Sequence, residues 1–175
     1  MKAQIKTYWK YLRYVLKHKW FVFLGCLKFK VPLWKAIIHD WDKFLPDEWS
    51  GYADWFFGSK SFEEWSRAKH TYMAAEAAPW GFFMKDRFDV AWLFHQNRNR
   101  HHWNFWILRN DLSEMFALPM PEADVREMLA DWYGAGWAIT GKPNPQLWYD
   151  RNKDRMNLHP QTRSLIERLL LETVL

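Results

Sequence analysis

Four side chains that could bind a metal ion stand at wide intervals in otherwise apolar surroundings. They are His18, the adjacent His39 and Asp40, and Asp131, which Glu127 precedes by one helical turn. Ionisable groups are rarely carried towards a core unless they are paired or bound to metal. Imidazole and carboxylate together suit Zn, Mn, Fe or Co, and one cysteine leaves no competing thiolate cluster. The set predicts a metal centre, although each member alone could make an ordinary hydrogen bond or ion pair.

A second group of histidines lies in the segment "FHQNRNRHHW". If this segment is helical, His95, Asn99 and His102 share one face, and His101 lies about 100° away from it. We predict that His95 and His102 point into the same polar pocket as the first four side chains. A surface position near a turn stays open for His101 and His102.

Helices must position these residues, because apolar spacings of three and four recur along the chain and strand signals are nearly absent. Pro32 and Pro46 suit the first turns of two helices, and Ser61 with Glu64 forms a capping box. The expected helices cover 3–28 (broken near Gly25), 32–44, 46–58, 61–78, 88–102, 121–140, a short segment around Trp148 and 159–175, with a loop over 79–87 and a connection over 109–120. The prediction is an all-α, single-domain helical bundle over residues 1–175.

Composition sets the class of protein. The chain has 175 residues, 49% apolar and 26% charged, which is ordinary for one globular domain. The apolar run over 20–27 is too short to span a bilayer, and no secretion signal is evident. A single cysteine, Cys26, excludes an internal disulfide, so we expect a cytoplasmic protein. The fourteen tryptophans are predicted mostly to fill the helical core.

Positive charge is concentrated at the start of the chain. Residues 1–35 hold nine lysines and arginines and no acid, whereas the whole chain carries a net charge of only +5. Such a basic, aromatic helix could attract phosphates, nucleic acid or an anionic membrane. A helix with a solvated lysine face is the plainer interpretation, and the sequence leaves both open.

The order of the first four residues resembles the signature of a known superfamily. His18, then His39 and Asp40, then Asp131 is similar to the H…HD…D pattern of the HD-domain metal-dependent phosphohydrolases. The stretch "HDWDK" also resembles the HDxxK form, in which the lysine (here Lys43) faces the substrate phosphate. Nearly the whole chain further resembles an uncharacterised phage and bacterial family of unknown function, through "RYVLKHKWFVF", "IIHDWDKFLPDEW", "FDVAWLFHQNRNRHHWNFW", "MPEADVREMLADWYGAGWA" and "LHPQTRSLIE".

The HD-domain resemblance implies an HD-like helical fold around one or two divalent ions, which could be Mn, Fe, Co, Zn or Mg. The resemblance assigns one ion to His18, His39, Asp40 and Asp131, and a second to further histidines, for which His95, His101 and His102 are the candidates. The chain departs from the well-characterised members because these three histidines lie within eight residues.

The resemblance also implies roles on the substrate side of the site. Asp40 would bridge ions or orient a water, and Asp42 or Glu127 would orient ligands or accept a proton. Positive charge and polar contacts for a phosphate would come from Lys43, Arg98, His101 and Asn99. Because an aromatic ring could stack on a base, the expected substrate is a nucleotide or related phosphate ester. In a phage, this activity would serve nucleotide metabolism or counter-defence in the host cytoplasm.

Two other functions stay open. A di-iron oxygenase is also known among HD-like folds and would use extra histidines. A non-enzymatic, basic phage accessory protein could instead bind nucleic acid through the N-terminal helix, or bind a host protein. The sequence has no Gly-rich phosphate loop, no G-x-S-x-G and no cysteine-based zinc motif, which excludes the common nucleoside-triphosphatase and serine-hydrolase classes.

Overall fold

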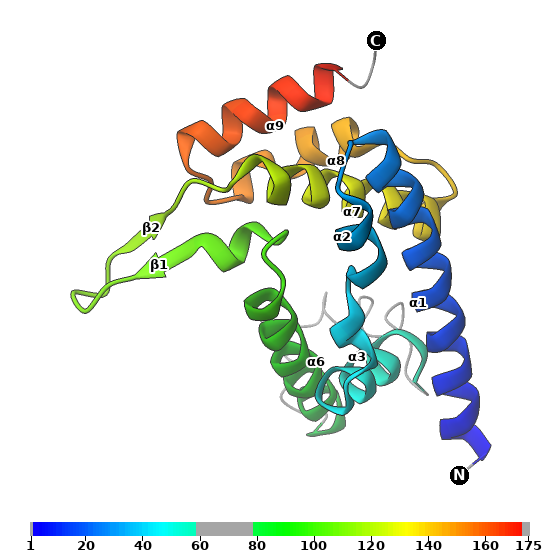
Figure 1. Cartoon of the computed structure of the whole chain (residues 1–175). Coiled ribbons are helices and arrows are strands. Elements are labelled where there is room, and N and C mark those ends of the chain that lie inside the picture. Colours follow the sequence, from blue (N-terminus) through cyan, green and yellow to red (C-terminus); the bar gives the residue numbers. More distant parts are fainter. Residues whose placement is uncertain (1, 59–78, 173–175) are drawn as a thin grey trace. The chain divides into compact units, whose positions relative to one another are not determined.

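Helices make up most of the structure, a computed structural model that describes the backbone of residues 2–58 and 79–172 and the side chains of 2–58 and 87–172. The helices are α1 (Lys2–Lys28), α2 (Leu33–Ile38), α3 (Pro46–Phe57), α6 (Pro79–Arg98), α7 (Glu122–Thr140), α8 (Pro145–Asn152) and α9 (Pro160–Glu172), with short 3-10 helices η1 (Trp41–Phe44), η2 (Trp103–Trp106) and η3 (Lys153–Arg155) (Figure 1). The predicted predominance of helices is confirmed. The all-α prediction needs one correction, because β1 (Ile107–Arg109) and β2 (Met115–Ala117) form an antiparallel hairpin in the expected 109–120 connection.

The described residues fall into two compact units. Unit 1 lies within Met1–Leu16 and Trp41–His95, and unit 2 within Lys17–Asp40 and Gln96–Leu175. The core of unit 1 is largely aromatic, and Tyr52 meets Phe88 edge-on with ring centroids 5.4 Å apart. In unit 2, α7 packs against α8 and α9 (Figure 1). The core there is mainly aliphatic and includes Val22, Met128, Leu129, Ile166 and Leu169.

Two glycines let α1 approach α7 closely within unit 2. A methyl group added at Gly25 would lie 2.7 Å from the carbonyl oxygen of Ala130, and one added at Gly134 would overlap Val22. The predicted break of the first helix near Gly25 is therefore wrong, because this glycine serves interhelical contact inside a continuous α1. The close approach brings the inner face of α1 against the polar face of α7.

The second predicted helix is shorter than expected. The sequence suggested one helix from Pro32 to about Phe44, but α2 ends at Ile38 and η1 begins only at Trp41. Between them Asp40 adopts a φ of +53°. Asp tolerates this left-handed conformation better than most residues, so the chain can turn sharply there.

The region around α6 also differs from the prediction. The helix begins at Pro79, where a loop over 79–87 was expected, since proline fits the first turn of a helix. It ends at Arg98, before the predicted end at residue 102, and the next residue is Asn99, a type that favours turns over helix interiors. The helix predicted to start with the Ser61 and Glu64 capping box lies outside the described residues.

The tryptophans whose side chains are described divide between core and surface. Trp55 and Trp132 are buried, and four more pack partly buried against the two cores, namely Trp49, Trp92, Trp103 and Trp106. Trp9, Trp20 and Trp34 are each about 60% exposed. The prediction that tryptophans mostly fill the core therefore holds for only some of them. Within residues 2–58 and 79–172, no helix combines the length and apolarity needed to cross a bilayer.

Candidate metal centre

Three separate elements of unit 2 bring four potential metal ligands together. α1 carries His18, the turn after α2 carries His39 and Asp40, and α7 carries Asp131. On a regular helix His39 and Asp40 would diverge by about 100°, so the left-handed turn at Asp40 is what directs both inward. The Lys19 ammonium supports this turn by donating to the backbone carbonyls of Ile37 and His39. We call these four residues the ligand cluster.

The ligand atoms of this cluster converge on one point. Nε2 of His18 lies 3.2 Å from Oδ2 of Asp40 and 3.2 Å from Oδ1 of Asp131. Nε2 of His39 lies 3.4 Å and 3.5 Å from the same two oxygens. His18, His39 and Asp40 are buried, and 15% of the Asp131 side chain is exposed.

These separations match a coordination shell. Zn–N and Zn–O bonds of about 2.0–2.2 Å in tetrahedral geometry place neighbouring ligand atoms roughly 3.3–3.6 Å apart. The four measured distances span 3.2–3.5 Å. Two imidazoles and two carboxylates would also balance the charge of a divalent ion. The buried cluster could therefore hold a metal ion.

Glu127 fixes which nitrogen of His39 faces the cluster. Nδ1 of His39 donates to Oε1 of Glu127 at 3.1 Å. Nε2 is then the atom turned towards Asp40 and Asp131, and it is buried. Metal-binding histidines commonly have this arrangement, with a carboxylate on the nitrogen that does not bind the ion.

A salt-bridge network holds Glu127 in turn. The Lys35 ammonium donates to Oε2 of Glu127 at 2.8 Å and to Oδ1 of Asp124 at 2.6 Å. Arg100 reaches the other oxygen of Asp124 at 3.1 Å. Lys35, Asp124 and Arg100 are not among the residues predicted from the sequence. The detectable signal was helical spacing, because Asp124 lies one turn before Glu127 on α7 and Lys35 lies one turn before His39.

Two members of the ligand cluster have shifted pKa values. Burial alone would raise the pKa of Asp131, but hydrogen bonds from His18 and His39 outweigh it and hold that pKa well below its usual range. Burial would likewise lower the pKa of His39, yet the Asp40 charge and hydrogen bonds with Asp131, Asp40 and Glu127 raise it well above its usual value.

A second pair of ligand atoms lies on the other side of Asp40. Nε2 of His101 is 3.4 Å from Oδ1 of Asp40, whereas the first group uses Oδ2. The rings of His101 and His102 are tilted relative to each other with centroids 4.3 Å apart, and each offers a ligand atom within 4.8 Å of one on Asp40. Burial, followed by the charge of His39, lowers the pKa of His101 to about 4. His101 is therefore neutral at neutral pH, contrary to the expected cation, and this form suits metal binding.

In unit 1, His95 contacts two buried carboxylates. Its Nδ1 is 2.9 Å from Oδ2 of Asp42 and 3.2 Å from Oε2 of Glu48, and we call these three residues the His95 cluster. Burial raises the pKa of Glu48, a hydrogen bond from His95 opposes this, and a hydrogen bond with Asp42 adds to the rise. Lys43 is also in unit 1, with its ammonium 5.9 Å from the centroid of the Tyr52 ring.

The end of α6 removes the predicted common face of His95, Asn99 and His102. Arg98 is the last helical residue and is exposed, and Asn99 begins a turn in which its carbonyl accepts from the backbone N–H of His102 at 3.1 Å. The i, i+7 argument for His102 is therefore wrong. Its place beside His101 comes from this turn.

The comparisons with known proteins identify a family but no activity. Residues 7–172 match a family described as a family of unknown function, DUF5662. Because this match spans nearly the whole chain, the chain belongs to that family, which confirms this part of the sequence analysis. No curated protein and no solved structure matches the chain significantly. The comparisons contain no link to the HD-domain superfamily, so that resemblance rests on the ligand cluster and Lys43.

Proposed function

We propose that this protein is a metal-dependent phosphohydrolase acting on a nucleotide or a related phosphate ester. The observation that carries the proposal is the convergence of four ligand atoms from His18, His39, Asp40 and Asp131 at 3.2–3.5 Å. The order of these residues, which resembles the HD-domain signature, supports phosphate-ester hydrolysis over other metal chemistry. An HD-like fold belongs to the same proposal.

Two groups of residues would hold metal ions, and Glu127 would orient one of the ligands. The ligand cluster would hold one divalent ion, and Asp40 with His101 and His102 would hold a second, since Oδ2 of Asp40 faces His18 and Oδ1 faces His101. A bound ion would supply a lowered pKa for water and polarisation of a phosphoryl oxygen. Glu127 would keep Nε2 of His39 directed at the cluster, since its carboxylate occupies Nδ1.

The substrate side of the site rests on the resemblance. Lys43, Arg98 and Asn99 are proposed to contact phosphate, and Asp42 is proposed to orient a neighbouring group. We expect Lys43→Ala to leave metal content unchanged and to lower phosphate-ester hydrolysis by about 10²-fold or more, because an ammonium stabilises charge developing on phosphate oxygens. An unchanged turnover number in this variant would refute the role of Lys43.

The test starts with protein purified without chelators. Elemental analysis should find about one or two divalent ions per chain, and assays with nucleoside mono-, di- and triphosphates and a simple phosphodiester should detect hydrolysis. Asp131→Asn should lose both metal and activity. Asp150→Asn provides a matched control, because that carboxylate is 47% exposed and pairs at the surface with the Lys153 ammonium at 3.7 Å and the Gln146 amide at 3.1 Å.

Two outcomes would contradict the proposal in different ways. A chain that binds metal stoichiometrically but hydrolyses none of these esters would refute the hydrolase and not the metal centre. A chain that retains iron and consumes oxygen would instead establish the oxygenase alternative. A chain that binds no divalent ion would refute both.

A further inference from the structure

Four large apolar side chains line the side of α1 that faces away from the core. Trp9, Leu16, Trp20 and Leu27 are each more than half exposed. Their spacings of seven, four and seven place them on one helical face, opposite the buried Tyr11. Single exposed apolar residues are common, but a contiguous row of them is typical of a surface that contacts a membrane, a protein or a ligand. We call these four residues the α1 stripe.

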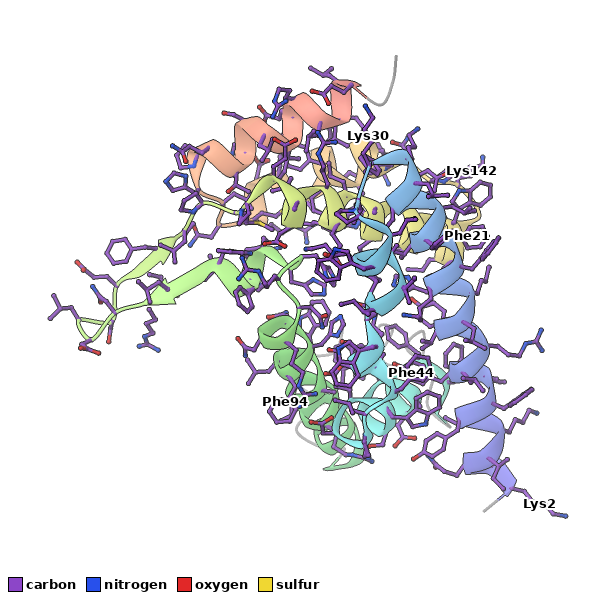
Figure 2. The ribbon with its side chains drawn as sticks, viewed as in Figure 1. Lys2, Phe21, Lys30, Phe44, Phe94 and Lys142 are labelled. Carbon is purple, nitrogen blue, oxygen red and sulfur yellow. The ribbon has the colours of Figure 1, made fainter. Side chains whose placement is uncertain are left out.

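Cations border this stripe along one side. Lys6, Lys10 and Arg13 are exposed and form no hydrogen bond or ion pair within the described structure, and at 100° per residue they fall on the face adjoining the stripe. The helix contains no acidic residue at any position. Figure 2 draws the side chains of α1, with Lys2 labelled near its N-terminal end and Lys30 just beyond its C-terminal end. Because this face carries positive charge and no negative charge, we expect its partner to be anionic.

We propose that this face of α1 binds the surface of an anionic phospholipid membrane, with the helix lying in the plane of the interface. The stripe would enter the boundary between headgroups and acyl chains, while the neighbouring cations would reach phosphate headgroups. From Trp9 to Leu27 the row extends about 27 Å, at 1.5 Å per residue, which gives a long line of contact. This inference is independent of the proposed hydrolase.

The composition of the face argues against other partners. A second copy of α1 would bring Lys6 and Arg13 against the same cations, with no acid on the helix to offset them. Nucleic acid would satisfy the cations and could stack on Trp9 or Trp20, but it offers no apolar partner to Leu16 and Leu27. A bilayer accommodates the tryptophans, the leucines and the cations together.

The experiment is vesicle co-sedimentation with the full chain. The probes are vesicles of pure phosphatidylcholine and vesicles of phosphatidylcholine mixed with phosphatidylglycerol, each at low and high NaCl. We expect binding to the anionic vesicles only, weakened by salt because the headgroup contacts are screened. Duplex and single-stranded DNA of comparable charge serve as competitors.

Two paired variants separate charge from apolar contact. Lys6→Glu with Arg13→Glu should weaken binding by about 25-fold or more, at roughly fivefold per cation lost. Its control, Lys142→Glu with Arg151→Glu, makes the same charge change on exposed residues outside α1. Trp9→Gln with Leu16→Gln should weaken binding by about tenfold or more. Its control is Leu112→Gln with Leu171→Gln, at positions that are 79% and 67% exposed.

Circular dichroism and thermal melting establish that each variant is folded before it is compared. Loss of binding in both α1 variants, with both controls binding like the wild type, supports the proposal. Three results would overturn it. These are no binding to anionic vesicles, vesicle binding that the α1 variants leave intact, and DNA binding that outcompetes the vesicles. A wild-type dimer that Trp9→Gln with Leu16→Gln dissociates would also overturn it, because the stripe would then be an interface between copies.

Discussion

Unit 1 and unit 2 each bury histidine together with carboxylates, but the two groups are built on different principles. In the His95 cluster, Asp42 and Glu48 both approach a single ring nitrogen, at 2.9 and 3.2 Å. In the ligand cluster, four atoms from four residues face one another, with nitrogen-to-oxygen distances of 3.2–3.5 Å. The first arrangement uses its carboxylates to hold one imidazole. The second leaves room for a bound ion between its members.

This contrast shows that residue types alone do not identify a metal centre. Both groups offer ligand atoms within 4.8 Å of one another and both are largely buried. The two clusters differ in the atoms that come together and in the number of residues that supply them. In unit 2 the carboxylate on Nδ1 of His39 belongs to Glu127, outside the ligand cluster, so Nε2 is available to an ion. Mutations in the two clusters should therefore have different consequences.

The largest effect is expected for Asp40→Asn. Asparagine tolerates the φ of +53° at this position, so the turn should survive while a charged ligand is lost. We expect metal affinity to fall by more than about 10²-fold, beyond the 10- to 100-fold typical of residues that only support a ligand. Elemental analysis after dialysis measures this. Thermal melting should lose the stabilisation that added metal gives the wild type.

Asp42→Asn is the matched variant in the His95 cluster. It removes a buried carboxylate that is bonded to His95, so we expect a cost of about 1–3 kcal/mol in unfolding free energy. Metal content should stay near that of the wild type. If Asp42→Asn released the ion as completely as Asp40→Asn, the distinction between the two clusters would be wrong.

The next largest effect is expected for Glu127→Gln. The amide can still meet Nδ1 of His39, but it loses the charge that now faces both His39 and Lys35. We expect metal affinity to fall by about 10- to 100-fold. Competition with a metal chelator of known affinity measures the change. An unaltered affinity would show that Glu127 has no part in orienting His39.

The sequence predicted the members of the ligand cluster because their types conflict with their apolar surroundings. It could not predict the turn that assembles them. The left-handed Asp40 and the six-residue α2 depend on tertiary contacts, including the Lys19 ammonium, whereas local pattern favoured one longer helix. The hairpin was missed because strands of three residues are too short to show alternation. Lys35 and Asp124 resemble ordinary helical surface charges until Glu127 is placed between them and His39.

A smaller effect is expected where α1 meets α7. Gly134→Ala places a methyl group against Val22, so we expect a loss of about 1–3 kcal/mol in unfolding free energy through overpacking. Because this contact aligns His18 with Asp131, metal affinity should fall as well. Gly136→Ala is the control, since its methyl group would meet the loop oxygen of Lys142 at 3.0 Å, away from α1. Urea denaturation measures the unfolding free energy of both variants. A larger loss of unfolding free energy in Gly136→Ala than in Gly134→Ala would contradict this role of Gly134.

The smallest effect is expected for a glutamate on the exposed side of the same helix that carries Glu127. Glu122 is 46% exposed and accepts from Arg126 at 2.9 Å and from Arg168 at 3.3 Å. The hydrogen bond from Arg126 is the main cause that lowers the pKa of Glu122. Because water and salt screen such pairs, Glu122→Gln should cost under about 1 kcal/mol at neutral pH and leave metal content unchanged.

The pH dependence of this cost has a definite sign. A carboxyl whose pKa is lower in the folded state stabilises the fold at pH values above its unfolded pKa, near 4.5. That contribution is lost as the pH falls through the lower folded-state value. The wild type and Glu122→Gln should therefore differ slightly in urea denaturation at pH 7 and converge in more acidic buffer. If the difference in unfolding free energy between the wild type and Glu122→Gln persisted in acid, the ionised Glu122 carboxylate would not be its cause. If Glu122→Gln also lowered metal affinity as much as Glu127→Gln, the assignment of Glu122 to the surface would be wrong.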